Sequence, residues 1–289
     1  MVSIDLEKWK RLSELGNRDK TKKAFECISV LGVEAVLIKG WVNSRFYDTD
    51  HVRTYTDVDI AISPSSDEYT KSIIRKTNYP GIIIDLHIGL RHLDKLSWSE
   101  LFKRSYITEL DGTPIRILAD EDNLRITSVH WLIDGGINKE KLWDIYYLVK
   151  NRRASFDWET CLNSNGPVRR TWVNAAIATA RDFLELDVSA LPKEIRNFRL
   201  PKWYLRTLEK EWKRGPYSRR ILSAVVMRPK LFAEQIYRRF PPNPIAATIE
   251  VEAPIDESWR PPVQLRSLLN KVGPFAKGVW RRMGENRGY

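Results

Sequence analysis

The sequence predicts an α+β protein, in which an N-terminal α/β domain is followed by a helical domain. Two features support this division. Short strand-like stretches alternate with helical ones over residues 1–118, whereas helical spacing dominates after residue 119. The chain has 289 residues, of which 43% are hydrophobic and 11% aromatic, so it can bury a core of ordinary size.

Within residues 1–118, periodicity and turn residues place the elements. Gly32 is well placed to end a helix, because glycine tolerates the left-handed conformation. Residues 57–62 alternate like a strand, and Asp111-Gly112 marks a hairpin turn. The expected helices cover residues 4–15, 18–31, 40–47, 63–77 and 97–105; the expected strands cover 35–39, 57–62, 81–87 and the hairpin 106–118.

Residues 119–240 form the expected helical domain, and residues 241–289 form a C-terminal segment. Helical spacing covers residues 120–134, 138–151, 157–164, 167–186 and parts of 193–240. The proline-rich stretch 241–263 is expected to be extended. It leads to a basic amphipathic segment, 263–289, with Leu265, Leu268, Leu269 and Val272 on one helical face. This segment either makes a peripheral contact with a membrane or a protein, or packs on its own chain.

Net charge is concentrated in one part of the chain. Of the formal charge of +11, an excess of ten comes from residues 151–240, which hold 19 basic and 9 acidic side chains. This pattern fits either an acidic partner, such as nucleic acid, a phosphorylated metabolite or an anionic membrane, or an ordinary solvated surface. Only two cysteines, no apolar signal-peptide core and no run long enough to be transmembrane together predict a cytoplasmic protein.

Three aspartates on two predicted strands suggest a metal site. Asp57 and Asp59 lie two residues apart, so a strand points both to the same face, with α-carbons about 6.6 Å apart. Asp85 on the next strand joins them if the two strands are neighbours in register. Oxygen ligands of this kind suit Mg²⁺ or Mn²⁺. Each motif alone is more often structural, because Asp-x-Asp is common in loops and a strand-end aspartate can cap the next element.

The same region supplies cations and a flexible turn. Lys39 ends an apolar strand and could hold a triphosphate, and Gly40 would let backbone N–H groups approach a ligand. Arg53 precedes the Asp-x-Asp strand and could clamp a phosphate. The alternatives are a solvent-facing lysine and an ordinary loop arginine. The sequence contains neither a Gly-x-x-x-x-Gly-Lys-[Ser/Thr] loop nor a Gly-x-Ser-x-Gly elbow, and its four histidines and two cysteines show no zinc spacing.

Several ordered landmarks match a known family. The pattern "VLIKGWVNSRFY…R…TDVDIAI…IIIDLH…VHWLIDGG…LWDIYYLV", over roughly residues 30–150, resembles the uncharacterised nucleotidyltransferase family of the polymerase-β-like superfamily. The resemblance implies a mixed-sheet palm with flanking helices, in which Asp57 and Asp59 bind catalytic metal and Asp85 is the third carboxylate. Lys39 and Gly40 stand where the superfamily usually has Gly-Ser or Gly-Gly, so the phosphate-binding geometry does not transfer directly.

The resemblance also implies an activity. A nucleoside monophosphate would pass from a nucleoside triphosphate to an acceptor, with release of pyrophosphate; the acidic acceptor, a metabolite, peptide, protein or RNA, could lie against residues 151–240. A non-catalytic nucleotide or nucleic-acid binding module and a membrane-surface protein are the alternatives. His87, His130, Lys141 and Asp144 match family landmarks without an assigned role. His130 could simply pack beside Trp131, and Lys141 could pair with Asp144.

Overall fold

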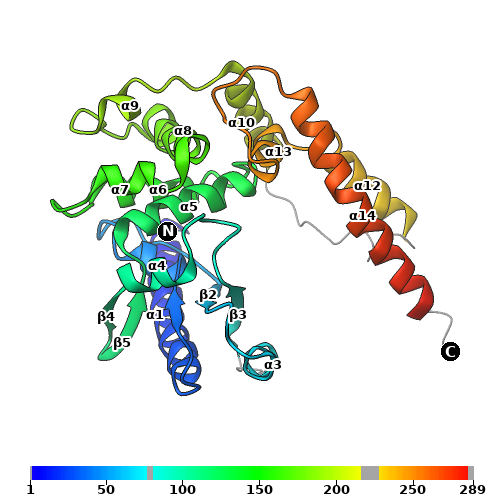
Figure 1. The fold of residues 1–289 in the computed structure, drawn as a ribbon. Helices are drawn as coiled ribbons and strands as arrows, with labels where there is room; N and C mark the ends of the chain where they lie inside the picture. Colours follow the sequence, from blue (N-terminus) through cyan, green and yellow to red (C-terminus); the bar gives the residue numbers. More distant parts are fainter. Residues whose placement is uncertain (1, 77–80, 216–227, 286–289) are drawn as a thin grey trace.

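The computed structural model describes residues 2–76, 81–215 and 228–285, without the side chains of residues 2–7, 75–76, 238–239 and 274–285. The α+β prediction is confirmed: a mixed five-stranded sheet is flanked by helices and followed by a mostly helical region (Figure 1). The strands are β1 (Ala35–Leu37), β2 (Asp57–Ile62), β3 (Ile83–Ile88), β4 (Tyr106–Leu110) and β5 (Thr113–Ile117). The helices are α1 (Val2–Ser29), α2 (Gly40–Ser44), α3 (Glu68–Lys76), α4 (Trp98–Arg104), α5 (Asp120–Ile133), α6 (Leu142–Lys150), α7 (Trp158–Asn163), α8 (Gly166–Leu184), α9 (Lys193–Arg196), α10 (Lys202–Arg214), α12 (Pro229–Arg239), α13 (Pro244–Glu250) and α14 (Pro261–Glu285).

Strand order in the sheet is β3-β2-β1-β5-β4. The pairs β2–β3 and β1–β5 are parallel, whereas β1–β2 and β4–β5 are antiparallel. The predicted hairpin turn connects β4 and β5, with positive φ angles of 48° at Asp111 and 82° at Gly112. Both central residues of a type I′ turn need positive φ, which explains the Asp-Gly pair.

The two faces of the sheet bury different cores. Leu37, Ile60 and Ile62 point to the face covered by α1, where they join Phe25 and Ile28. The opposite face packs against the helical region in a second cluster, which contains sheet residues such as Val36 and Ala61 together with residues of α5, α6, α8 and α13. Because Asp57 and Asp59 share the strand face of Ala61, the carboxylates point toward the helices rather than toward α1.

The N-terminus differs from the prediction of two helices, since α1 runs without a break through Gly16 and Asn17. A glycine inside a helix costs about 1 kcal/mol relative to alanine. Here a tertiary contact stabilises the continuous helix: the Asn17 side chain is buried and donates a hydrogen bond to the Tyr55 carbonyl. Gly32, with φ of 67°, adopts the predicted left-handed conformation after the helix.

The proline-rich stretch is not extended throughout, contrary to the prediction. Residues Pro244–Glu250 form α13, which begins at Asn243: its Oδ1 accepts hydrogen bonds from the backbone N–H groups of Ile245 and Ala246. Proline at the first helical position needs no N–H partner, so Asn243-Pro244 is a favourable helix start. Ile245 and Ile249 are buried in the core cluster beside α5.

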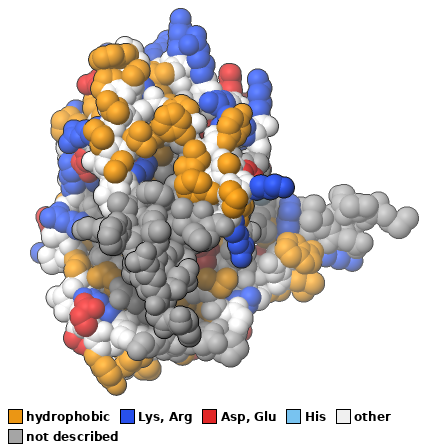
Figure 2. All heavy atoms as spheres, turned by 90° about the vertical axis from the view of Figure 1, so that its right-hand side faces the viewer, with side chains coloured by type: hydrophobic (Ala, Val, Ile, Leu, Met, Phe, Trp, Pro, Cys, Tyr) orange, Lys and Arg blue, Asp and Glu red, His pale blue; other side chains and the backbone are white. Residues whose placement is uncertain are grey.

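The C-terminal helix α14 exposes part of its apolar face. The exposed fractions of Leu265, Leu269 and Val272 are 57%, 63% and 55%. Figure 2 shows hydrophobic side chains gathered beside Lys and Arg side chains on the face that Figure 1 presents at its right. The predicted membrane or protein contact of residues 263–289 stays a prediction, and side chains from residue 274 onward lie outside the described ones. Among the described residues, none of the helices combines the length and the hydrophobicity that a membrane span requires.

Candidate functional site

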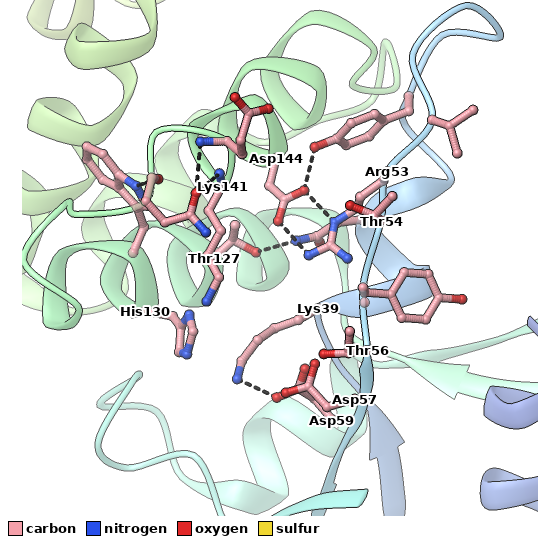
Figure 3. Close-up of a pocket in the computed structure, with 18 of the residues that line it drawn as sticks. Lys39, Arg53, Thr54, Thr56, Asp57, Asp59, Thr127, His130, Lys141 and Asp144 are labelled. Carbon is pink, nitrogen blue, oxygen red and sulfur yellow. Dashed lines mark hydrogen bonds and ion pairs between the residues drawn. The ribbon is translucent and has the colours of Figure 1, made fainter. Parts of the chain in front are cut away.

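A pocket of about 610 Å³ lies between the sheet and the helical region. One wall comes from the segment between β1 and β2 together with β2 and β3; the other comes from α5 and the turn leading into α6 (Figure 3). Trp9 and Ser13 of α1 complete the lining. The volume falls within the roughly 300–1,000 Å³ of small-molecule sites in proteins.

The three predicted aspartates all line this pocket. Asp57 and Asp59 lie on the same face of β2, and the parallel register of β2 and β3 pairs Asp59 directly with Asp85. Asp57 pairs with Ile83, so it is one diagonal step from Asp85. The side chain of Asp59 is 8% exposed and that of Asp85 is 53% exposed, so Asp59 is deep in the site and Asp85 is at its mouth. Their role as metal ligands remains a prediction.

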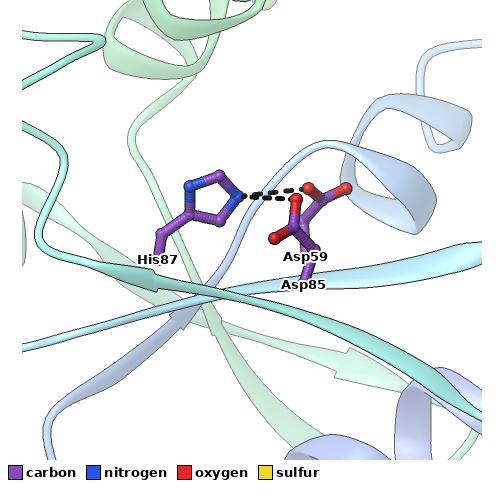
Figure 4. A group of neighbouring side chains, drawn as sticks. All are labelled: Asp59, Asp85 and His87. Carbon is purple, nitrogen blue, oxygen red and sulfur yellow. Dashed lines mark hydrogen bonds and ion pairs between the residues drawn. The ribbon is translucent and has the colours of Figure 1, made fainter. Parts of the chain in front are cut away.

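Lys39 and His87 surround the buried carboxylate. Lys39 Nζ lies 2.6 Å from Asp59 Oδ1 and 3.3 Å from His87 Nε2. His87 Nε2 is also 3.3 Å from Asp59 Oδ1 and 3.3 Å from Asp85 Oδ2 (Figure 4). Asp59 is therefore neutralised by a buried ammonium, and His87 bridges the carboxylates of two strands.

The protonation of His87 and Asp85 reflects this contact. Burial disfavours the charged imidazole, but hydrogen bonds to Asp59 and Asp85 outweigh it and raise the pKa of His87. The hydrogen bond from His87 lowers the pKa of Asp85 to about 2, against the opposing effect of its partial burial. Asp85 is thus ionised throughout the physiological range and available as an anionic ligand.

The donor set fits a divalent cation. One ligand atom each from Asp59, Asp85 and His87 lies within 4.8 Å of the others, and this is the group of potential metal ligands found among the described residues. Asp57 lies outside that group, although it lines the same pocket. The sequence predicts oxygen ligands only, whereas the structure adds a histidine nitrogen, which suits transition metals better than the hard cation Mg²⁺.

Arg53 is held by a carboxylate from the opposite wall. Its Nε and Nη2 lie 2.6 and 2.8 Å from the two oxygens of Asp144, and the Tyr47 hydroxyl donates a hydrogen bond of 2.7 Å to the same carboxylate. Among the described residues, Arg53 Nη1 is buried without a hydrogen-bond partner. The predicted phosphate clamp by Arg53 stays a prediction, since the bidentate pair already occupies two of its nitrogens.

Lys141 pairs with a residue other than the one considered from the sequence. Its Nζ lies 3.4 Å from Asp134 Oδ2, with both side chains 41% exposed, while Asp144 turns to Arg53. His130 faces the pocket together with Lys141, as Figure 3 shows. Burial, helped by the Lys39 ammonium, lowers the pKa of His130 to about 4, so its imidazole is neutral near pH 7.

Gly40 begins α2 with a φ of 28°, a conformation that residues with a Cβ rarely adopt. A Cβ at this position would also contact the Tyr55 ring at 3.5 Å. The preceding Lys39 has a φ of 53° and a ψ of −133°, which is unusual for a lysine. The turn therefore places the Lys39 ammonium at Asp59 while bringing the α2 N-terminus to the pocket.

The sequence reasoning missed a set of polar residues on α5 and α2. Asn43 Nδ2 donates to Thr127 Oγ1 at 3.3 Å, and Asn123 Nδ2 donates to Asn43 Oδ1 at 3.0 Å. Asn123, Thr127 and His130 recur at helical spacing along α5. That polar stripe was a readable signal, because a buried helix face normally carries apolar residues.

Comparison with known proteins gives a structural match of low similarity and no match by sequence. No family model matches the chain, and no curated protein matches it. One similar solved structure is of an antigenic nucleotidyltransferase-like protein from Paracoccidioides brasiliensis, with 13% sequence identity, a TM-score of 0.41, and coverage of 60% of this chain and 91% of that chain. At this level of similarity, the function has to be inferred from the residues of the site.

Proposed function

We propose that this protein is a metal-dependent nucleotidyltransferase, which transfers a nucleoside monophosphate from a nucleoside triphosphate to an acceptor and releases pyrophosphate. The observation that carries the proposal is the parallel register that sets Asp59 beside Asp85, with Asp57 on the same strand face and all three in one pocket. Paired carboxylates on neighbouring strands are costly unless cations neutralise them. A site that binds Mg²⁺ or Mn²⁺ for a phosphate substrate accounts for that arrangement.

The charge of the pocket supports a requirement for metal in the proposed reaction. Its lining includes three cationic side chains, Lys39, Arg53 and Lys141, and six carboxylates, Asp57, Asp59, Asp85, Asp134, Glu140 and Asp144. Each of the three cations already has a carboxylate partner. A triphosphate carries several negative charges, so it binds such a lining only together with divalent cations.

Each residue of the site would have a separate role in the proposed reaction. Asp57, Asp59, Asp85 and His87 would hold the metal, and Gly40 would let the backbone N–H groups of its turn approach the triphosphate. A divalent cation held by these residues would neutralise charge on the phosphates and lower the pKa of the attacking hydroxyl. Asp85 lies at the mouth of the pocket, where its carboxylate would accept the hydrogen bond of the attacking hydroxyl and orient it. Positioning and charge neutralisation supply most of the catalysis.

The acceptor is proposed to be acidic, on the basis of the basic residues within 151–240. A non-catalytic nucleotide-binding module is the second candidate, favoured by the Lys39–Asp59 ion pair, which stabilises the carboxylate without any metal. The two candidates differ in one product: a transferase releases pyrophosphate, whereas a binding module does not.

Thermal unfolding tests the proposal first. The wild type and Asp57→Asn/Asp59→Asn are measured with each nucleoside triphosphate, with and without Mg²⁺ or Mn²⁺. A ligand at 100 times its Kd stabilises the folded state by about 2.7 kcal/mol. We expect one triphosphate to raise the midpoint of the wild type only when metal is present, and to leave the double variant unchanged.

Glu109→Gln is the matched control, because Glu109 is an exposed carboxylate on β4, at the other edge of the same sheet. The stabilising triphosphate, labelled at its α-phosphate, is then incubated with candidate acidic acceptors. Metal-dependent pyrophosphate release by the wild type and Glu109→Gln supports transfer. Triphosphate binding without pyrophosphate release in the presence of any acceptor favours the binding module, and the absence of any shift contradicts both candidates.

A further inference from the structure

The backbone of Lys39 is unusual for its residue type. Its φ of 53° and ψ of −133° lie in a backbone region that glycine adopts readily and lysine adopts rarely. Residues persist in such conformations only where the surrounding structure holds them. They cluster at ligand clamps and switch regions. The Lys39 carbonyl is fixed by a hydrogen bond of 3.0 Å from the Asn43 N–H. The strained turn directs a long cationic side chain into the carboxylate site.

The Lys39 ammonium lies where a metal ion would be expected. Its Nζ is 2.6 Å from Asp59 Oδ1 and 3.3 Å from His87 Nε2, and both residues belong to the group of potential metal ligands. The side chains of Lys39 and Asp59 are each 8% exposed. A divalent cation on Asp59 Oδ1 would therefore have to displace the ammonium or bind close to a like charge.

We propose that Lys39 is an exchangeable internal cation. The Lys39 ammonium neutralises Asp59 before substrate binds. When a divalent cation takes its place on Asp59, the Lys39 side chain moves and its ammonium pairs with the phosphates. Metal and triphosphate then promote each other's binding, because each stabilises the arrangement that the other needs. The identity of the anion rests on the proposed nucleotidyltransferase function, whereas the displacement of Lys39 by metal does not.

The charge of the site makes this exchange favour the joint binding of metal and triphosphate. A lone metal must compete with the ammonium for Asp59, and a lone triphosphate meets a lining in which carboxylates outnumber cations. Only the two ligands together satisfy Asp59 and also offer the displaced ammonium a new partner. The lysine side chain suits this movement, because it is a point charge on a flexible four-carbon stem.

The first test follows Lys39 in the wild-type protein, so it does not depend on a variant that folds. Lysines are labelled with an amine-reactive reagent, with and without Mn²⁺, and the modified residues are identified by mass spectrometry. Lys71 is the matched control: its side chain is 10% exposed and its Nζ is paired with Glu68 Oε1 at 2.8 Å, away from the pocket. We expect Mn²⁺ to increase the labelling of Lys39 and to leave that of Lys71 unchanged.

The second test measures Mn²⁺ affinity by calorimetry in the wild type, Lys39→Met, Lys39→Gly and Lys71→Met. Removing the competing ammonium should tighten binding of Mn²⁺ alone by about fivefold or more in both Lys39 variants. Lys39→Gly also relieves the backbone strain, so it guards against a variant that fails to fold. Inorganic triphosphate should tighten Mn²⁺ binding less in these variants than in the wild type, after correction for the complex that the two ligands form in solution.

The outcomes separate this proposal from the proposed function. Mn²⁺ binding that leaves Lys39 labelling unchanged, or that is not tightened by either Lys39 variant, overturns the exchange and leaves the transferase proposal intact. Increased labelling and tightened binding, with no nucleoside triphosphate bound in any of the proteins, support the exchange and contradict the transferase. Failure of Mn²⁺ to bind the wild type and both Lys39 variants overturns the exchange, and the absence of any metal-dependent triphosphate binding contradicts the transferase.

Discussion

Arg53 and Asp144 form a bidentate ion pair across the pocket, with N–O distances of 2.6 and 2.8 Å and side chains 11% and 6% exposed. The pair connects the segment before β2 with α6, residues 91 positions apart in the chain. Tyr47 donates a further hydrogen bond to Asp144. This network fixes the distance between the carboxylate wall and the helical wall of the pocket.

Breaking this pair on one side should be strongly destabilising. Arg53→Met or Asp144→Leu leaves the remaining charge buried and unpaired, which costs about 3–5 kcal/mol. Arg53→Met/Asp144→Leu should lose less stability than either single variant, because it leaves no orphaned charge. Urea unfolding measures all three. Asp19→Asn, in the exposed Lys23–Asp19 pair, is the contrast and should change stability by about 0.5 kcal/mol or less. Additive losses in the double variant would contradict the coupling.

The same pair predicts a dependence of stability on pH. Burial alone would raise the pKa of Asp144, but the Arg53 guanidinium outweighs it and lowers the pKa. A depressed folded-state pKa gives stability that is complete above the unfolded value of about 3.9 and is lost as the pH falls through the lower folded value. Unfolding free energy should therefore fall less steeply below pH 4 in Arg53→Met/Asp144→Leu than in the wild type. If unfolding free energy changes equally with pH in the wild type and the double variant from pH 6 to pH 3, the pair does not contribute to the pH dependence.

Gly40 should tolerate no side chain. Gly40→Ala places a Cβ on a residue with a φ of 28°, and we expect a loss of about 1–2 kcal/mol and weaker metal-dependent triphosphate binding. Gly16→Ala is the matched control, since Gly16 lies inside α1 with open space around its Cβ position and should gain about 0.5–1 kcal/mol. Chemical denaturation measures both changes. If Gly40→Ala leaves the free energy of unfolding unchanged, the turn relaxes freely to accept the Cβ.

Strand periodicity made the carboxylate face predictable. A strand has a side-chain period of two, so the shared face of Asp57 and Asp59, and that of Asp85 and His87, follow directly from their spacing. Which residues of β2 and β3 lie opposite each other depends on the strand register, and this register sets Asp59 opposite Asp85. The helix at 244–250 was also readable from Asn243-Pro244, but the proline content favoured an extended chain.

Long-range pairing was not predictable from local patterns. Lys141 and Asp144 have the spacing of an ion pair on a helix, yet Asp144 turns to Arg53 because the bidentate geometry satisfies both of its oxygens. Lys39 reads as a strand-end lysine, and only the fold shows that its ammonium lies on Asp59. Charged side chains choose partners by proximity in the folded protein, and sequence spacing carries that information only within one element.

His87 should set the preference for the metal. A nitrogen ligand beside carboxylates disfavours Mg²⁺, a hard cation that takes oxygen ligands, relative to a transition metal such as Mn²⁺. We expect His87→Gln to weaken Mn²⁺ binding by about 10–100-fold and Mg²⁺ binding much less. Calorimetric titration with each metal gives the comparison. His92→Gln is the control, because His92 stacks on the His87 ring at 5.4 Å and lies outside the ligand group. Equal weakening for both metals would remove His87 from the ligand set.

The exposed stripe of α14 should bind an anionic membrane surface, if the contact predicted for residues 263–289 is with lipid. Leu265 and Leu269 are 57% and 63% exposed, and the α14 sequence carries five basic residues against one glutamate. Because burying a leucine contributes about 1.5–3 kcal/mol, Leu265→Ser/Leu269→Ser should weaken vesicle binding by at least about tenfold without lowering the thermal midpoint. Sedimentation with anionic and with zwitterionic vesicles measures the affinity. Val30→Ser, at a residue 83% exposed after α1, should bind like the wild type; equal binding by the α14 variant would assign the stripe to a protein contact or to none.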